Sequence, residues 1–94
     1  MITVIAHYTA AAAADAVRQL LARHAAASRA EPSCLHFDAH QGIDNPDDFA
    51  LAERYESQAA YAEHRRTPHL RRNVATELVA LLTAQSGTVI ETAL

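Results

Sequence analysis

In Glu53-Arg-Tyr-Glu-Ser-Gln-Ala-Ala-Tyr-Ala-Glu-His64-Arg-Arg-Thr-Pro-His69, a strand ends and two helices begin. Ser57 is a good helix N-cap, because its hydroxyl can accept a hydrogen bond from a free backbone N–H of the first turn. The helix that it starts is short and runs to about Arg65. Thr67 caps a second helix with Pro68 at its first position, where the missing N–H is harmless. The segment therefore gathers a tyrosine, carboxylates and two histidines in an otherwise alanine- and leucine-rich chain.

The chain before this segment predicts a strand and a long helix. Residues 2–8 are rich in β-branched side chains and are typical of a strand. Residues 10–30 predict one helix that Pro32 ends, although the alanine run from Ala10 gives no clear start signal. One face of this helix carries residues spaced three or four apart, which indicates a buried stripe. That stripe comprises Val17, Leu20, Leu21, His24 and Ser28.

The remaining segments complete a β-α-β-β-(α)α-β order. Residues 35–40 alternate in polarity, as a strand with two different faces does. Residues 42–48 contain Asn45-Pro46 and form a turn, and residues 49–56 return as the next strand. The last helix has a predicted buried stripe, and residues 88–92 form a last strand. This order predicts a single α+β domain over residues 1–94, a ferredoxin-like split β-α-β fold with helices on one face of an antiparallel four-stranded sheet. The stripe of the last helix comprises Leu70, Val74, Leu78, Leu81 and Leu82.

The composition excludes several classes of partner. The chain has 94 residues, a net charge of −3 and no basic stripe, which argues against nucleic acid. It contains no apolar run of about 20 residues that would span a membrane. A lone Cys34 and the absence of a charged leader favour a soluble, cytoplasmic protein. Large apolar side chains are few in so short a chain, so we expect a second subunit to add buried area.

Several motifs give the chain a resemblance to a known family. These are residues 1–6, the turn Arg29-Ala-Glu-Pro-x-Cys-Leu, the Asn45-Pro46 hairpin, Glu53-x-Tyr55-Glu-Ser57 and His64-x-x-Thr67-Pro-His69. Over nearly its whole length the chain resembles the antibiotic biosynthesis monooxygenase family. The resemblance implies a homodimer whose two sheets pack into an α+β barrel, with a pocket between sheet and helices in each subunit. Members include cofactor-free monooxygenases of anthrones and quinols, haem-degrading enzymes, an isomerase and many proteins of unknown activity.

Two departures from the family argue against haem degradation. The haem-degrading members that this chain resembles place a tryptophan where His64 stands, and this chain has no tryptophan. They place the haem-ligating histidine near Asn73 or Val74, and neither side chain replaces an imidazole. Some cofactor-free anthrone oxygenases also use a tryptophan at the His64 position. From the two departures, we expect no haem, and the protein should need no other cofactor. The position of His64 in the motif still places it in the pocket.

Three residues are candidates for catalysis. The imidazole of His64 has an ordinary pKa near 6.5, so it can take a proton from a phenol or an activated C–H at neutral pH. Tyr55 offers an aromatic wall and a hydroxyl that could donate to a developing oxyanion. Glu53 shares the face of its strand with Leu51 and Tyr55, and could orient His64. Each also has a structural interpretation: a helix-end histidine, a packing tyrosine, and a carboxylate that holds an arginine or a backbone N–H.

Further residues are predicted to bind substrate or to face a partner. The substrate-binding candidates are Leu51, His24, Phe37, His69 and Asn73. Ala50, Ala52 and Arg54 point to the opposite face of their strand, where we expect a second subunit. His36, Asp38 and His40 share one face of their strand, but alternate residues lie about 7 Å apart, which is too far for one metal ion. We expect these three on the dimer face and predict no metal site.

These features favour a cofactor-independent monooxygenase of an electron-rich aromatic such as an anthrone or quinol. The partners are then a small aromatic substrate and O2. An isomerase or lyase that acts through an enolate would need the same base but no oxygen. A non-catalytic module that binds small molecules in the same pocket is a third hypothesis. No phosphate loop, dinucleotide fingerprint or Ser-His-Asp order is present in the sequence.

Overall fold

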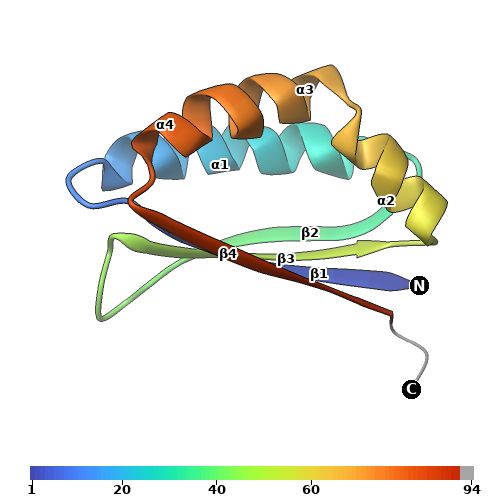
Figure 1. The fold of residues 1–94 in the computed structure, drawn as a ribbon, viewed down its shortest axis with the longest axis horizontal. Helices are drawn as coiled ribbons and strands as arrows, with labels where there is room; N and C mark the ends of the chain where they lie inside the picture. The colour runs from blue at the N-terminus through green and yellow to red at the C-terminus, as the bar shows by residue number, and fades with distance from the viewer. Residues whose placement is uncertain (92–94) are drawn as a thin grey trace.

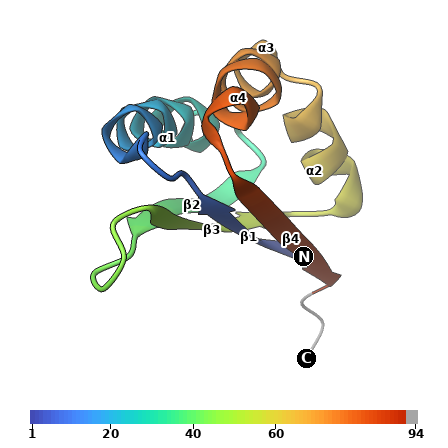
Figure 2. The same ribbon diagram turned by 60° about the vertical axis from the view of Figure 1, so that its left-hand side comes forward.

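A four-stranded antiparallel sheet carries all the helices on one of its faces, in a computed structural model that describes residues 1–91 (Figures 1 and 2). The strands are β1 (Ile2–Thr9), β2 (Cys34–Gln41), β3 (Asp48–Tyr55) and β4 (Ala84–Glu91). They lie in the order β2-β3-β1-β4, so the first strand is central and the last is an edge. The predicted ferredoxin-like α+β fold is confirmed.

The helices form a second layer above the sheet. They are α1 (Ala14–Arg29), α2 (Gln58–Arg65) and a rod made of α3 (Pro68–Leu70), the π-helix η1 (Arg71–Leu78) and α4 (Val79–Leu81). Figure 2 shows α2 apart from the rod, at the far end of the layer from α1. Ser57 and Thr67 cap α2 and α3 as predicted, since their hydroxyls accept from the N–H groups of Ala60 and Leu70. No helix within residues 1–91 is long and apolar enough to cross a membrane.

The strand register fixes which side chains face the helices. Residues opposite each other in an antiparallel pair share a face, and the pairs Val4–Glu53, Ala6–Leu51 and Phe37–Glu53 are all buried. Leu51, Glu53 and Tyr55 therefore lie on the covered face, as predicted from their alternation. The core beneath α1 consists of Tyr8, Val17, Leu20, Leu21, Phe37, Phe49, Leu51, Leu78 and several alanines.

The bounds of β1, β2 and β3 differ by one residue from those predicted, and larger differences occur at the first helix and the last strand. The first helix begins at Ala14 and not at Ala10, because Ala10 is buried in a turn where its N–H donates to the carbonyl of Asp47 and Ala12 has a φ of 66°. It ends at Arg29, three residues before Pro32. The last strand begins at Ala84, four residues earlier than predicted, and its predicted end, residue 92, lies outside the described residues.

The last helix also has a different buried stripe from the one predicted. The N–H of Val79 donates to the carbonyl of Val74, five residues back, which is the π-helical pattern. With this wider turn, the buried positions are Asn73 and Leu78, five residues apart. The other predicted members of the stripe are only half-buried. The apolar residues Leu81 and Leu82 follow the π-helix and pack at the margin of the core.

Candidate functional site

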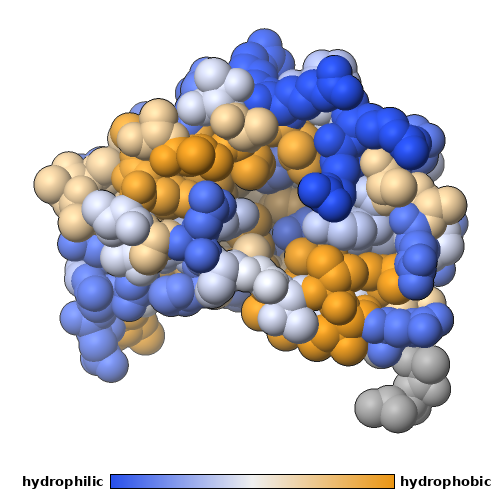
Figure 3. All heavy atoms as spheres, in the orientation of Figure 1, coloured by the Kyte–Doolittle hydropathy of each residue, from blue (hydrophilic) through white to orange (hydrophobic). Residues whose placement is uncertain are grey.

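A cavity of about 520 Å³ lies between the sheet and the helices, on the side of β4. Its floor comes from β1 and β3, with Val4, Ala6, Tyr8, Leu51 and Glu53, and its open side from residues 85–89 of β4. The helices contribute His24, Tyr61, His64, Arg65, Leu70, Val74 and Ala75. Figure 3 views the molecule from this side, where the surface is hollowed between the helix layer and β4. The lining is largely apolar, with charged groups gathered at the end nearest α2.

His64 lies at that end, in the last turn of α2, and only 2% of its surface is exposed. Its Nδ1 is 2.7 Å from Oε2 of Glu31, and its Nε2 is 3.7 Å from Oε1 of Glu53. A carboxylate that accepts from Nδ1–H fixes the ring and its tautomer, which leaves the lone pair on Nε2. Burial lowers the pKa of His64, and its contact with Glu31 offsets part of that effect. The imidazole is therefore neutral at neutral pH, with a basic nitrogen directed toward Glu53.

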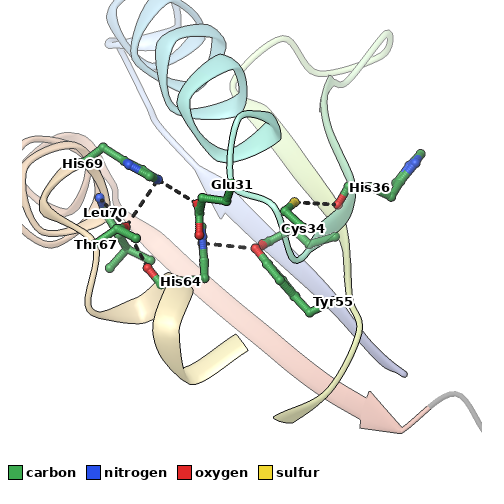
Figure 4. A network of polar contacts seen from close by, with 9 residues as sticks. Glu31, Cys34, His36, Tyr55, His64, Thr67, His69 and Leu70 are labelled. Atoms are coloured by element: carbon green, nitrogen blue, oxygen red, sulfur yellow. Dashed lines mark hydrogen bonds and ion pairs between the residues drawn. The ribbon is translucent and has the colours of Figure 1, made fainter. Parts of the chain in front are cut away.

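Glu31 is one of the site residues that were not predicted from the sequence. It lies between α1 and β2, 33 residues from His64 in the chain, and its Oε2 also lies 2.9 Å from Nε2 of His69. Figure 4 shows its carboxylate between the two imidazoles. Its backbone is held on both sides, because Glu31 N–H donates to the carbonyl of Ser28 and Cys34 N–H donates to the carbonyl of Glu31. The available signal was its place in the Arg29-Ala-Glu-Pro motif.

Glu53 and Tyr55 form a buried pair on β3. The Tyr55 hydroxyl donates to Oε1 of Glu53 at 2.6 Å. Burial raises the pKa of Glu53 from 4.5 to about 7, against the opposing effect of the Tyr55 hydrogen bond. Burial and the neighbouring Glu53 also raise the pKa of Tyr55, so its hydroxyl stays protonated. A carboxyl group that titrates near neutrality beside His64 can hold or release a proton there.

Tyr55 does not have the position that its predicted role as an oxyanion donor requires. The side chain is fully buried behind Glu53 and is not among the residues that line the cavity. Its hydroxyl is already committed to Glu53. The tyrosine therefore contacts the cavity only through the carboxyl group that it holds in place.

The five predicted substrate-binding residues divide into two groups. Leu51 and His24 line the cavity, whereas Phe37, His69 and Asn73 do not. Phe37 is buried against the rings of His24 and His64, with centroids 5.4 Å and 6.0 Å away. His69 and Asn73 line a separate groove, between α1 and η1. These last two are separated from the cavity because the helix rod turns them toward α1.

His24 stands in the cavity wall as an uncharged imidazole. Its pKa is lowered to about 4, mainly by burial and also by the nearby rings of His64 and His69. Its Nδ1 is buried with no hydrogen-bond partner among the described residues. The three histidine rings lie within 6.0 Å of one another, centroid to centroid. This end of the cavity thus concentrates imidazoles and two carboxylates in a buried space.

The polar residues of β2 lie on the other face of the sheet. His36 pairs with Asp38 at 2.9 Å, and Asp38 also lies 3.5 Å from Arg29. The register places His36, Asp38 and His40 opposite Arg54, Ala52 and Ala50. This is the shared face that the alternation predicted. None of the three is among the residues that line the cavity.

Comparisons with known proteins agree on one family. The model of antibiotic biosynthesis monooxygenases matches residues 1–76. The crystal structure of PA3566 from Pseudomonas aeruginosa is 33% identical with a TM-score of 0.88, covering 95% of this chain and 90% of that one. Rv0793 from Mycobacterium tuberculosis is 34% identical with a TM-score of 0.86, covering 96% and 92%. A structure named antibiotic biosynthesis monooxygenase is 26% identical over all of both chains, with a TM-score of 0.91. A search of curated proteins gave no match. The chain belongs to the antibiotic biosynthesis monooxygenase family.

Proposed function

We propose that the protein is a cofactor-independent monooxygenase that oxidises an electron-rich aromatic, such as an anthrone or quinol, with O2. The observation that carries the proposal is the orientation of His64. Glu31 holds its Nδ1, so the basic Nε2 is directed to the buried, charged end of an otherwise apolar cavity. An apolar cavity with a few convergent polar groups suits a flat aromatic ligand.

For an anthrone, the chemistry begins with loss of a proton from the ring methylene to Nε2 of His64. The resulting carbanion is stabilised as an aryl oxide and transfers an electron to O2, and the two radicals combine into a peroxide anion at that carbon. This anion takes back the proton removed in the first step and becomes a hydroperoxide. The hydroperoxide then loses water, with the second methylene hydrogen leaving as a proton, to give the quinone. Overall the methylene and one O2 become a carbonyl and one water, so the substrate supplies all the electrons.

Glu53 and Tyr55 have supporting roles in this mechanism. Glu53 lies 3.7 Å from Nε2 of His64, and its pKa of about 7 allows it to receive the proton that the histidine has taken. Tyr55 is a positioning residue, because its hydroxyl fixes Glu53 and does not reach the substrate. His24 and Leu51 contact the bound ring system from opposite walls of the cavity.

The proposal includes a homodimer formed through the open face of the sheet. Large apolar side chains on the strands are half-exposed there, including Ile5 at 49% and Leu35 at 50%. Such a patch on a small protein marks an interface. We expect the interface to bury more than about 1,000 Å², the threshold for a specific contact. A monomeric mass at micromolar concentration in sedimentation equilibrium would contradict it.

The test is turnover of anthrones and quinols in an oxygen electrode, with EDTA present. We expect one O2 consumed for each quinone formed, and His64→Ala should lower kcat by roughly 10²–10⁴, the usual contribution of a positioned base. Added imidazole should restore part of that loss. Glu63→Gln is the control, since this exposed residue pairs with Arg66 on the surface of α2 and lies outside the cavity and away from the sheet.

Each of the other outcomes identifies a different function. Product formed without oxygen uptake would replace the monooxygenase with an isomerase or lyase. Aromatic ligands that bind without turnover, with His64→Ala changing only their affinity, would indicate a binding module. Unchanged turnover in folded, dimeric His64→Ala would remove the base from the mechanism.

A further inference from the structure

Glu31, His64 and His69 bring three potential metal ligands to one place. The ligand atoms Oε2, Nδ1 and Nε2 of these side chains all lie within 4.8 Å of one another. All three side chains are largely buried, with 15%, 2% and 18% of their surface exposed. We infer that they form a binding site for a divalent transition-metal ion such as Zn²⁺, and that the bound ion switches off the proposed base.

The chemistry of the donors favours this class of ion. Two imidazoles and one carboxylate are ligands that Zn²⁺ prefers, at about 2.0–2.2 Å from the ion. Tetrahedral ligands at that distance are roughly 3.3 Å apart. The Glu31 contacts of 2.7 Å and 2.9 Å would have to open by a few tenths of an ångström, and the widest separation would have to contract. Rotations of the three side chains would have to supply both changes, and a water would occupy the fourth position.

The local backbone is built to hold the two histidines together. The helix break at Thr67-Pro68 lies between them, so His64 ends one helix and His69 begins the next. The Thr67 hydroxyl donates to the carbonyl of His64 at 2.7 Å and lies 3.3 Å from Nε2 of His69. A continuous helix would place residues five apart on different faces. The break is therefore what directs both rings toward Glu31.

The charges around His64 favour a cation. Among residues 1–91, Glu31 and Glu53 form ion pairs only with histidines, and no arginine neutralises either carboxylate. Glu53 stands at the nitrogen of His64 that faces away from Glu31. Histidines that bind metal usually donate their other N–H to a carboxylate or carbonyl, which orients the ring and raises its basicity. Glu53 is in the position for that second contact.

The ion would act on the reaction through the tautomer of His64. A metal bound at Nδ1 takes the lone pair there, so the ring proton must reside on Nε2 and point at Glu53. Nε2 then has no lone pair with which to accept a proton from the substrate. The inhibition rests on the proposed function, whereas metal binding does not.

The experiment measures binding and activity separately on EDTA-treated dimeric protein. Calorimetric titration with ZnCl₂ should give one ion per chain, and Glu31→Gln and His69→Ala should each weaken binding at least about 10-fold. The control is the pair of exposed histidine variants His36→Ala and His40→Ala, which should leave the affinity unchanged. Long-range ¹H–¹⁵N spectra should show the ring proton of His64 move from Nδ1 to Nε2 as Zn²⁺ is added.

The outcomes separate the two proposals. No binding by the wild type, or binding lost only in the His36 and His40 variants, would overturn the metal site and leave the proposed function untouched. Zn²⁺ that binds, moves the ring proton of His64 to Nε2 and still leaves oxygen uptake undiminished would overturn the inhibition and the assignment of His64 as the base. Circular dichroism confirms that each variant is folded.

Discussion

Each face of the sheet departs at a few positions from the usual distribution of polar and apolar side chains. The covered face contains Glu53, 6% exposed, and meets His64, 2% exposed, beneath the helices. The open face exposes about half of Ile5, Leu35 and Ile90. Buried charge is costly and exposed large apolar side chains are unfavourable when they gather. Both departures have a reason if the covered face performs chemistry and the open face binds a second chain.

The same alternation produces both faces. Along β3, Leu51, Glu53 and Tyr55 point toward the helices, and the residues between them point away. The outward residues Ala50 and Ala52 are small, which permits a second sheet to approach closely. A shift of one residue in register would exchange the two sets. Variants at neighbouring strand positions can therefore test the proposed chemistry on the covered face and the proposed dimer on the open face.

The largest effect is expected on the open face. Ile5→Asp should raise the dimer dissociation constant by at least about 10³, roughly 4 kcal/mol, because it buries an unpaired carboxylate at the interface. Sedimentation equilibrium would then show a monomer at micromolar concentration. Ile43→Asp is the matched control, since Ile43 is 96% exposed in the hairpin loop, away from the sheet face. Equal masses for both variants would show that the open face is not the interface.

The next effect concerns the buried carboxyl group of the covered face. Burial raises the pKa of Glu53 from 4.5 to about 7, so the folded state binds this proton more tightly than the unfolded state. The resulting stability is fully present below about pH 4.5 and is lost as pH rises through 7. Between pH 4.5 and 8 the wild type should lose roughly 3 kcal/mol of unfolding free energy relative to Glu53→Gln, at about 1.4 kcal/mol per pKa unit.

Urea denaturation across this pH range, with EDTA present, measures the difference. Glu63→Gln provides the control, because Glu63 is exposed and pairs with Arg66 on the surface of α2. Its stability should follow that of the wild type at every pH. Parallel curves for Glu53→Gln and the wild type would mean that Glu53 titrates as an ordinary carboxyl group and that the covered face holds no unusual acid.

Local patterns in the sequence were enough to predict most of the fold and half of the site. Alternation along residues 49–56 predicted both faces of β3, and Ser57 and Thr67 predicted the two helix starts. The motif that contains His64 predicted that this histidine lies in the pocket. These features depend on spacing within one element or on a cap, so neighbouring residues determine them.

Features that depend on distant contacts were missed. Glu31 is 33 residues from His64, and its place in the Arg29-Ala-Glu-Pro motif does not by itself indicate that its carboxylate meets two imidazoles. The 3.6-residue period predicted Val74 as buried and could not anticipate the π-helical turn that buries Asn73 and Leu78. The side-chain hydrogen bond between Tyr55 and Glu53 decides which of the two reaches the cavity, and strand alternation places both on the same face.

The smallest expected effect is the difference in stability between Tyr55→Phe and Tyr61→Phe. The rings of these two tyrosines lie 5.2 Å apart, centroid to centroid. Tyr55→Phe removes the donor to Glu53 from a fully buried site, so it should lower the free energy of unfolding by about 1–2 kcal/mol. Tyr61→Phe should cost less than about 0.5 kcal/mol, because Tyr61 is half-buried and no hydrogen bond of its hydroxyl is found within residues 1–91.

A double-mutant cycle with Glu53→Gln assigns the Tyr55 effect to its partner. If the hydroxyl acts through Glu53, the two substitutions should be coupled by 0.5 kcal/mol or more in urea denaturation, as expected for groups in one hydrogen-bonded pair. Tyr55→Phe should also reduce turnover less than His64→Ala, because it keeps the base and loosens only the carboxyl group beside it. Additive stabilities would leave Tyr55 as a packing residue, and a loss of turnover equal to that of His64→Ala would return it to direct contact with the substrate.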